Sequence, residues 1–297
     1  MSTLGDLARL ARPKGTLLFL TVPLTGYGFA HWDGRLALTR PIAMAFVLAA
    51  WALLSAGSLW LNAALDGDDE GGALFSMNAR RPKHLVAYAW LALALAVALA
   101  SYAGVLVGVA CALCAVMAVL YSHPRTKWKA HPVMGPLVNG AGYGLASFFA
   151  GYAVVARERG ALSDAATAMT CGSALAMSLL ALFVVGMTFA AQAYQEGDDA
   201  RRGYRTLVVT AGPAACLRVA TWTMRAALAG VAVGAALGVY PRLVLVGLPV
   251  FALAELTMAR WRRAPGGGSA DLAAQFATRM VAGGAVLVAL ATFAALR

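Results

Sequence analysis

About twenty residues, from Pro41 to Leu61, contain no charged side chain. A helix of this length can cross the hydrocarbon core of a bilayer, which takes about 20 mostly apolar residues. Similar apolar stretches recur along the chain, separated by short polar breaks. Hydrophobic residues make up 61% of the sequence and charged residues 12%, with a mean hydropathy of +0.72. A soluble domain cannot bury that much apolar surface, so we expect an integral membrane protein.

The apolar stretches predict one all-α domain over residues 1–297, a bundle of about nine transmembrane helices with no soluble module attached. The expected spans are 15–32, 41–64, 84–102, 104–121, 133–155, 166–193, 208–239, 241–259 and 273–296, of which 208–239 is longer than a span needs. Proline and glycine within these stretches are compatible with membrane helices, because neighbouring helices can satisfy the freed backbone groups.

The basic residues in the loops predict the orientation of the chain. Fifteen of them lie in the loops of one side, and six lie on the opposite side. The fifteen are Arg9, Arg12, Lys14, Arg80, Arg81, Lys83, Arg125, Lys127, Lys129, Arg201, Arg202, Arg205, Arg260, Arg262 and Arg263. By the positive-inside rule, we expect a multi-pass protein of a bacterial inner membrane with a cytoplasmic amino terminus. The net charge of +11 thus indicates topology and a lipid bilayer as partner, and no nucleic acid.

Seven of the thirteen acidic residues form two clusters in loops on the same predicted side. One follows the second span, from Asp66 to Glu70, and the other follows the sixth, from Glu196 to Asp199. Hard cations such as Mg²⁺ are commonly held by one or two carboxylates together with substrate phosphates. Arginines follow each cluster, so the pair predicts a site for divalent cations and a polyanion. Solvated loop charge is the alternative for either cluster alone.

The first cluster resembles a motif of the UbiA-type intramembrane prenyltransferases, which have nine transmembrane helices around a central cavity and two aspartate-rich loops. The family motif N-D-x-x-D-x-x-x-D is similar to the segment with Asn62, Asp66 and Glu70, where Ala63 replaces the first aspartate. A variant of the motif, N-x-x-x-D-x-D-E-G, resembles the run from Asn62 to Asp69 instead.

The second cluster lies in AYQEGDDARRGYRT, which resembles the family's D-x-E-G-D-x-x-x-G-x-x-T with one extra residue. Aligning the EGD tripeptide puts Tyr194 in the place of the first aspartate. Aligning Gly203 and Thr206 puts Gln195 there and Asp199 at the last aspartate. The sequence leaves both registers open.

Two other segments are similar to family motifs. YSHPRTKWK, residues 121–129, resembles Y-S-x-P-x-x-x-K-x-K, and NARRP, residues 78–82, resembles N-x-x-R-P. Arg12 and Asn139 also stand where the family has such residues.

The resemblance implies transfer of an isoprenoid chain from a prenyl diphosphate to a small aromatic or lipid-like acceptor, with Mg²⁺ as cofactor and the active-site loops on the cytoplasmic side. The implied catalytic residues are Asp66, Tyr121, Asp198 and Asp199. The implied metal ligands are Asp66, Asp68, Asp69, Glu70, Gln195, Asp198 and Asp199. The implied diphosphate ligands are Asn62, Arg80, Arg81, Lys127, Lys129, Arg201 and Arg202, and the implied acceptor contacts are Arg12 and Asn139.

Ionisation of an allylic diphosphate leaves a carbocation, which needs a dry cavity with aromatic faces. The aromatic candidates are Tyr121, Trp60, Phe75 and Tyr194. Two other functions use the same architecture. A terpene cyclase captures the cation with the substrate's own double bond, and a non-catalytic relative keeps the fold to bind or transport a lipid.

Several charged residues lie at or within predicted spans, among them Arg225, Glu255 and Arg279. Charges at membrane depth are costly, and they usually pair with one another or face the interior of the bundle. We expect a structural salt bridge, with a polar contact for the acceptor as the alternative.

Overall fold

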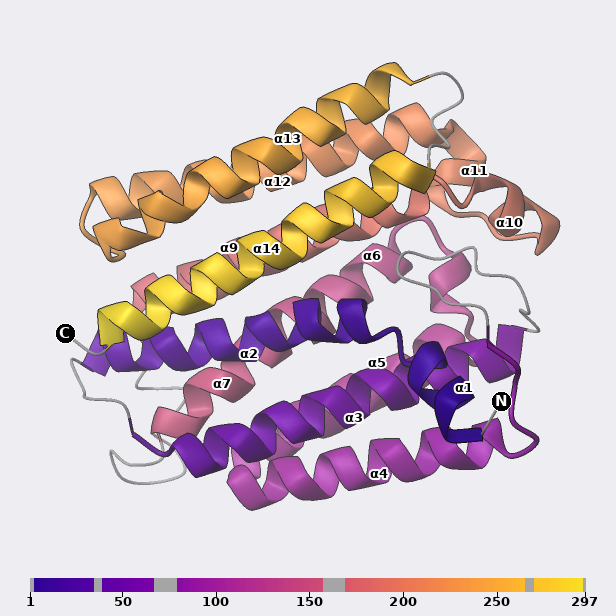
Figure 1. The fold of residues 1–297 in the computed structure, drawn as a ribbon, viewed down its shortest axis with the longest axis horizontal. Helices are drawn as coiled ribbons and strands as arrows, with labels where there is room; N and C mark the ends of the chain where they lie inside the picture. Colours follow the sequence, from indigo (N-terminus) through magenta and orange to yellow (C-terminus); the bar gives the residue numbers. More distant parts are fainter. Residues whose placement is uncertain (1–2, 35–38, 67–78, 157–168, 265–269, 296–297) are drawn as a thin grey trace.

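The computed structural model describes residues 3–34, 39–66, 79–156, 169–264 and 270–295. These residues form a bundle of helices that run side by side, and the two ends of the chain lie at opposite ends of the bundle (Figure 1). The predicted all-α class is therefore confirmed. Within the described residues, six helical segments are long and apolar enough to cross a membrane: Pro41–Leu65, Leu85–Ala103, Val105–Ser122, Cys171–Gln192, Pro213–Ala236 and Arg242–Arg263.

The helices follow the predicted spans closely, because each apolar stretch ends at a polar or glycine-containing break. The long helices are α2 (Pro13–Gly34), α3 (Pro41–Asp66), α4 (Leu85–Ala103), α5 (Val105–Ser122), α9 (Cys171–Gln192), α12 (Pro213–Ala236), α13 (Leu248–Arg263) and α14 (Ala270–Ala295). Short helices connect or precede them: α1 (Thr3–Leu10), α10 (Glu196–Arg201), α11 (Leu207–Ala211) and the 3₁₀ helices η1 (Trp128–Ala130) and η4 (Arg242–Gly247).

The predicted span 133–155 is divided into three parts. It begins as α6 (Met134–Asn139), continues as the π-helical segment η2 (Gly140–Ala146), and ends as α7 (Ser147–Ala156). π-Helical turns are rare and frequently occur at functional sites. Gly142 and Tyr143 of η2 both line the central cavity of the bundle.

The predicted stretch 208–239, longer than a span needs, contains the apolar helix α12 and the end of the short helix α11. Gly212 has a φ of +80° and separates α11 from α12. Glycine adopts this left-handed conformation without steric cost, and the fixed φ of Pro213 suits the first position of the next helix.

Helices α2 and α7 cross in direct backbone contact. A Cβ atom at Gly151 would lie 1.8 Å from the carbonyl oxygen of Pro23, and one at Gly26 would lie 2.0 Å from that of Phe148. No side chain fits at either position, so the glycines allow the close crossing that forms one wall of the bundle.

Arg40 ties three helices together at the end of the bundle opposite α1. It directly precedes α3, its Nη1 donates to the carbonyl oxygen of Val154 in α7 at 2.8 Å, and its Nη2 donates to that of Ala103 in α4 at 3.4 Å. Both carbonyls belong to the C-terminal ends of helices, where a cation is favoured by the helix dipole.

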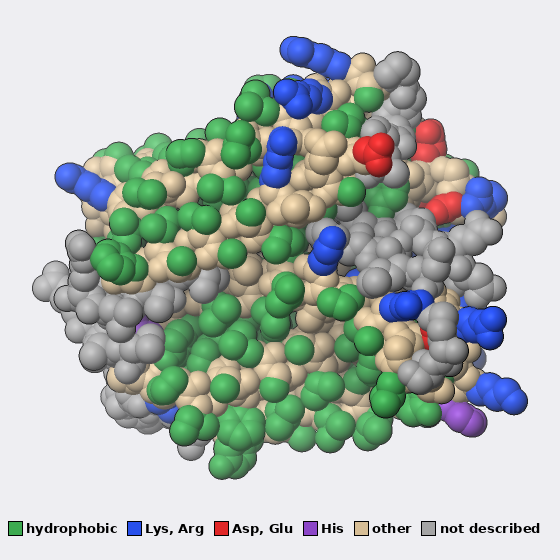
Figure 2. Space-filling view, in the orientation of Figure 1, with side chains coloured by type: hydrophobic (Ala, Val, Ile, Leu, Met, Phe, Trp, Pro, Cys, Tyr) green, Lys and Arg blue, Asp and Glu red, His purple; other side chains and the backbone are tan. Residues whose placement is uncertain are grey.

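The surface matches a protein surrounded by lipid. Figure 2 shows hydrophobic side chains over much of this face, Asp and Glu side chains toward the end that carries α1 and α10, and Lys and Arg side chains at that end and at several places along the upper part. Large apolar side chains are exposed on several helices, among them Trp90, Leu113, Val116 and Trp222. With the six apolar spans, this surface describes a multi-pass membrane protein.

Candidate active site

A cavity of about 450 Å³ lies inside the bundle. Its deep part is lined by apolar side chains, including Phe29, Phe148, Tyr240 and Phe251. Polar and charged residues from the loop ends line it as well. Four described cations, Arg9, Arg12, Lys129 and Arg202, face two described carboxylates, Asp198 and Asp199. This excess of positive charge favours a polyanionic ligand.

The second acidic stretch lines the cavity because it is helical. Gln195, Asp198, Asp199 and Arg202 all line the cavity, and they are spaced as i, i+3, i+4 and i+7. Residues with this spacing lie on one face of a helix. Glu196, which the spacing leaves out, is exposed. Gln195 and Asp199, the residues of one of the two possible registers, therefore both line the cavity, whereas Tyr194 does not.

Asp199 is held in place by the residues that follow it. The side chain is 5% exposed, and the hydroxyl of Thr206 donates to its Oδ2 at 2.7 Å. The backbone N–H of Tyr204 donates to the Asp199 carbonyl oxygen at 2.9 Å. Gly203, with a φ of +68°, makes the turn that brings Thr206 back to Asp199. This arrangement explains the spacing of the aspartate, glycine and threonine in the motif.

Asp198 sits beside Asp199 on the same face and forms an ion pair with Arg201. The Arg201 side chain is 72% exposed and does not line the cavity. A surface pair of this kind contributes little to stability. The diphosphate contact expected for Arg201 stays a prediction, and in this structure its guanidinium pairs with Asp198.

Lys129 is the buried cation of the site. It lies in η1, is 7% exposed, and donates from Nζ to Oδ1 of Asn62 at 2.8 Å. The hydroxyl of Ser122 donates to the same Asn62 oxygen at 3.2 Å. Lys127, two residues earlier, has a φ of +40°, is exposed and does not line the cavity. The structure thus separates two lysines that the sequence motif treats alike.

Tyr204 is a site residue that the sequence motif did not identify. It is 8% exposed and lines the cavity, with the Lys129 ammonium 5.8 Å and the Arg202 guanidinium 5.9 Å from its ring centroid. Contacts of this length between a cation and an aromatic face are attractive. The backbone N–H of Arg205 also donates to the Ala130 carbonyl oxygen at 2.9 Å and joins the two loops. The sequence feature that could have identified Tyr204 is its position as an aromatic residue within an arginine-rich loop.

The first acidic stretch is described only in part. Asn62 and Ala63 line the cavity near the end of α3, and Asp66 is the last residue of that helix. The side chain of Asp66, and all of Asp68, Asp69 and Glu70, lie outside the described residues. Within the described parts of the chain, no group of three or more His, Cys, Asp and Glu is arranged to hold a metal ion.

The remaining predicted site residues separate into two groups. Arg12, Tyr121 and Asn139 line the cavity, as does Arg9, which was not predicted. Arg80 and Arg81 do not line it. The backbone N–H of Arg80 donates to Oδ1 of the buried Asp6 at 3.3 Å, so this segment packs against α1.

The aromatic lining differs from the prediction. Trp60 and Tyr194 do not line the cavity, and Phe75 lies outside the described residues. The Trp60 indole N–H instead donates to the carbonyl oxygen of Leu7 in α1 at 2.9 Å. Burial raises the pKa of the Tyr194 phenol, and the nearby Arg12 guanidinium opposes that shift. Besides Tyr121, the cavity has Phe19 and Tyr143, whose stacked rings lie 4.1 Å apart.

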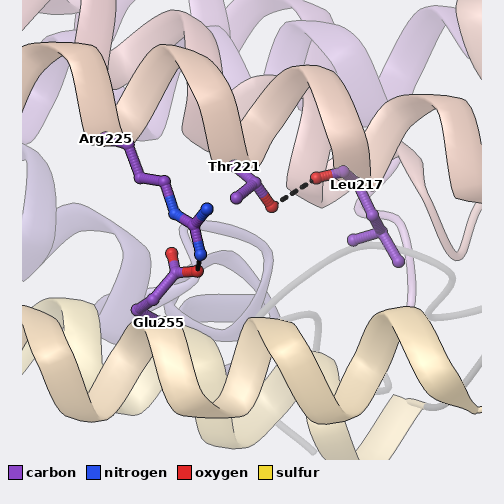
Figure 3. A network of polar contacts seen from close by, with 4 residues as sticks. All are labelled: Leu217, Thr221, Arg225 and Glu255. Atoms are coloured by element: carbon purple, nitrogen blue, oxygen red, sulfur yellow. Dashed lines mark hydrogen bonds and ion pairs between the residues drawn. The ribbon is translucent and has the colours of Figure 1, made fainter.

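The predicted intramembrane salt bridge is confirmed. Arg225 of α12 pairs with Glu255 of α13, and in the same view the Thr221 hydroxyl donates to the Leu217 carbonyl oxygen (Figure 3). Arg279 of α14 donates to the Leu253 carbonyl oxygen at 2.9 Å and to the Thr257 hydroxyl. None of the three charged residues lines the central cavity. The network therefore joins α12, α13 and α14 and does not contact an acceptor in that cavity.

Comparison with known proteins gives matches to one family. The sequence matches the UbiA prenyltransferase family over residues 20–278. A UbiA homologue from Archaeoglobus fulgidus, solved bound to DMAPP and Mg²⁺, has 19% identity and a TM-score of 0.71, with 98% of this chain and 99% of that chain covered. The same homologue bound to GPP and Mg²⁺ has 20% identity and a TM-score of 0.70, with the same coverage.

A second archaeal structure has the same fold. The apo structure of a UbiA homologue from Aeropyrum pernix K1 has 17% identity and a TM-score of 0.68, covering 92% of this chain and 96% of that chain. A comparison with proteins of curated function finds no match to this sequence.

Proposed function

Because the chain belongs to the UbiA prenyltransferase family, we propose that it transfers a prenyl chain from a prenyl diphosphate to a small acceptor within the membrane. One observation carries the proposal. An apolar cavity inside a membrane bundle is lined, among the loop residues, by four cations and two carboxylates. The two parts match the two halves of a prenyl diphosphate, a hydrocarbon chain and a polyanionic head group. DMAPP and GPP, with Mg²⁺, are bound in the A. fulgidus homologue.

Mg²⁺ fits the oxygen donors at the polar part of the cavity. Asp198 and Asp199 offer adjacent carboxylates, and Gln195 offers a carboxamide oxygen on the same face. One or two carboxylates plus substrate phosphates are the usual Mg²⁺ ligands. We propose that these residues hold the ion, together with Asp66, Asp68, Asp69 and Glu70 of the first acidic stretch. When bound, Mg²⁺ would neutralise charge on the departing diphosphate.

The cationic side chains that line the cavity would also neutralise charge on the departing diphosphate. Lys129 and Arg202 lie 5.8 and 5.9 Å from the Tyr204 ring centroid, and Arg12 lines the cavity with them. Cleavage of the allylic carbon–oxygen bond sends the electron pair to the diphosphate. Positive groups already aimed at that oxygen stabilise the transition state without reorganising, which is the largest catalytic effect in many enzymes. Arginine also offers a bidentate fork that lysine lacks.

The rest of the cavity protects the carbocation from water. Tyr121, Phe19 and Tyr143 are the aromatic candidates near it, and the deeper wall is apolar. A cation is attracted to aromatic faces and is not quenched where water is excluded. We also propose the predicted orientation, with the amino terminus and the charged end of the cavity on the cytoplasmic side of an inner bacterial membrane.

The test is transfer by the purified protein in lipid vesicles. Prenyl-labelled geranyl or geranylgeranyl diphosphate is supplied with Mg²⁺, simple phenols and an extract of membrane lipids, and the products are separated and weighed by mass spectrometry. We expect Mg²⁺-dependent transfer of the label, lost in Asp66→Ala and Asp199→Asn. Asp271→Asn should remain active, because Asp271 is exposed in the first turn of α14 and does not line the cavity.

Three results would contradict the proposal. Full activity in Asp66→Ala or Asp199→Asn would show that these carboxylates do not hold a metal ion that the reaction requires. A cyclic hydrocarbon formed without any acceptor would indicate a terpene cyclase. Failure to bind Mg²⁺ together with an unreactive prenyl diphosphate analogue, measured by calorimetry, would indicate a non-catalytic lipid-binding relative.

A further inference from the structure

Gln192 is a buried polar side chain whose oxygen has no partner among the described residues. It is the last residue of α9, it is 6% exposed, and it lines the central cavity. No hydrogen bond is made to its Oε1. An unsatisfied buried acceptor costs free energy, and native proteins keep few of them, so each calls for an explanation.

Several other polar side chains on the cavity wall form hydrogen bonds within the protein. The hydroxyls of Thr25, Ser58 and Thr188 donate to carbonyl oxygens of their own helices at 2.7, 2.7 and 3.0 Å. Asn62 accepts from both Lys129 and Ser122. Packing therefore gives these groups partners, whereas the Gln192 oxygen has none among the described residues.

The position of Gln192 along α9 identifies the part of a substrate that it meets. The cavity-lining face of this helix carries Phe183, Val184 and Met187 before Gln192, and Gln195 follows at the start of the charged region. Gln192 thus lies at the boundary between the apolar and the charged lining. A prenyl diphosphate with its head among the cations and its chain in the apolar part has its reactive C1 atom at this boundary.

We propose that Gln192 binds the prenyl acceptor through a hydrogen bond from the acceptor's hydroxyl group to Oε1, and so selects hydroxyl-bearing acceptors. This inference rests on the proposed transferase function. An attacking atom must come within about 3–3.5 Å of the reacting carbon, so the acceptor has to occupy the same level as C1. Gln192 is then a specificity-determining residue, because a hydrogen-bonding site rejects an analogue that lacks the matching donor.

The role of Gln192 is orientation and not proton removal, because a carboxamide is not basic. In the transfer, the C1–O bond of the prenyl diphosphate breaks and its electron pair leaves with the diphosphate. A bond forms between C1 and the acceptor, and the proton that the acceptor loses is carried away by the departing diphosphate. The oxygen of Gln192 holds the acceptor's hydroxyl at the boundary before this exchange.

The test compares two probes that differ only in the hydrogen-bond donor, 4-propylphenol and its methyl ether. Each is titrated by calorimetry into the full chain in detergent, loaded with Mg²⁺ and geranyl S-thiolodiphosphate, which is unreactive. For the wild type we expect the phenol to bind about tenfold more tightly than the ether. In Gln192→Leu this ratio should fall to about one. In Gln192→Glu, which keeps an acceptor oxygen, the preference should persist.

The outcomes separate this inference from the proposed function. If the wild type does not bind the thiolodiphosphate with Mg²⁺, the transferase proposal fails. If that analogue binds, then a wild type that does not prefer the phenol, or the same preference in Gln192→Leu, overturns the role of Gln192 alone. Loss of preference in Gln192→Glu would also overturn it. An unchanged affinity for the analogue and an unchanged melting temperature in Gln192→Leu show that the variant is folded.

Discussion

The buried ammonium of Lys129 should account for a large part of diphosphate binding and ionisation. Lys129 is 7% exposed, lines the cavity and is oriented by Asn62 at 2.8 Å and by the ring of Tyr204. Two unit charges about 4 Å apart interact by about 4 kcal/mol at an effective dielectric constant of about 20. In Lys129→Met, water and the remaining cations replace part of the lost attraction to the diphosphate. We therefore expect a loss of about 2–3 kcal/mol, a decrease of about 30- to 150-fold in kcat/KM.

The assay is the initial rate of diphosphate release from geranyl diphosphate, because this product forms whichever acceptor is used. The matched control is Arg125→Met, which removes an exposed cation from the same loop and should change kcat/KM by less than about twofold. Lys127→Met tests whether both lysines of the sequence motif act, or only the one that lines the cavity. Since Lys127 is exposed and outside the cavity, its loss should cost less than about threefold.

The stability of Lys129→Met is expected to match that of the wild type. Methionine can fill the space of the lysine stem, and the Asn62 oxygen keeps its hydrogen bond from Ser122. A decrease of less than about threefold in kcat/KM, with a normal melting temperature, would refute the assignment of Lys129 as a diphosphate ligand. An equal loss of kcat/KM in Lys127→Met would show that lining the cavity does not determine which lysine contributes to the reaction.

Three further predictions concern packing at and away from the site. Tyr204→Leu should weaken Mg²⁺-dependent binding of geranyl S-thiolodiphosphate by about five- to tenfold in calorimetry, because about 0.5–0.7 kcal/mol of attraction to each of the two neighbouring cations is lost. Tyr204→Phe keeps the ring and should stay within about twofold; equal weakening in both variants would contradict this. Arg40→Met should lower the free energy of unfolding by about 2 kcal/mol, since charged hydrogen bonds to two helix ends are lost. Its control is Arg242→Met, which removes an exposed arginine and should leave the denaturation midpoint unchanged. Gly151→Ala should prevent folding, because its Cβ would lie 1.8 Å from a backbone oxygen, whereas Gly197→Ala, with no atom within 4 Å of its Cβ, should fold normally. The measurement is the yield of monodisperse protein in detergent. A normal yield of Gly151→Ala would show that α2 and α7 do not cross this closely.

The polar part of the candidate site could be predicted only where local periodicity decides it. Asp198 and Asp199 were assigned from the motif, and the helical spacing of α10 turns both toward the cavity. The motif could not choose between Tyr194 and Gln195, because one extra residue shifts the alignment. A helix turns each residue by a set angle, so the formation of α10 puts Gln195, Asp198 and Asp199 on the cavity wall.

Contacts between distant loops could not be predicted from the motif at all. Lys129 meets Asn62 across 67 residues of sequence, and Tyr204 meets Lys129 across a similar separation. Such contacts depend on how α3, α5 and α9 pack, which no local pattern contains. For the same reason the sequence grouped Lys127 with Lys129, and it assigned aromatic roles to Trp60 and Tyr194 that the cavity gives to Phe19 and Tyr143.

The sequence by itself determined that the chain is a helical membrane protein and where its apolar helices run. Charge-free stretches such as Pro41–Leu65 have no stable place except in lipid or a protein core, so hydropathy alone locates them. It also placed most of the acids and cations at the helix ends, since a charge within a span is costly. Which of those charges share a cavity, and that the Gln192 oxygen has no partner among the described residues, follow from the tertiary structure, because both depend on side chains from different helices meeting in space.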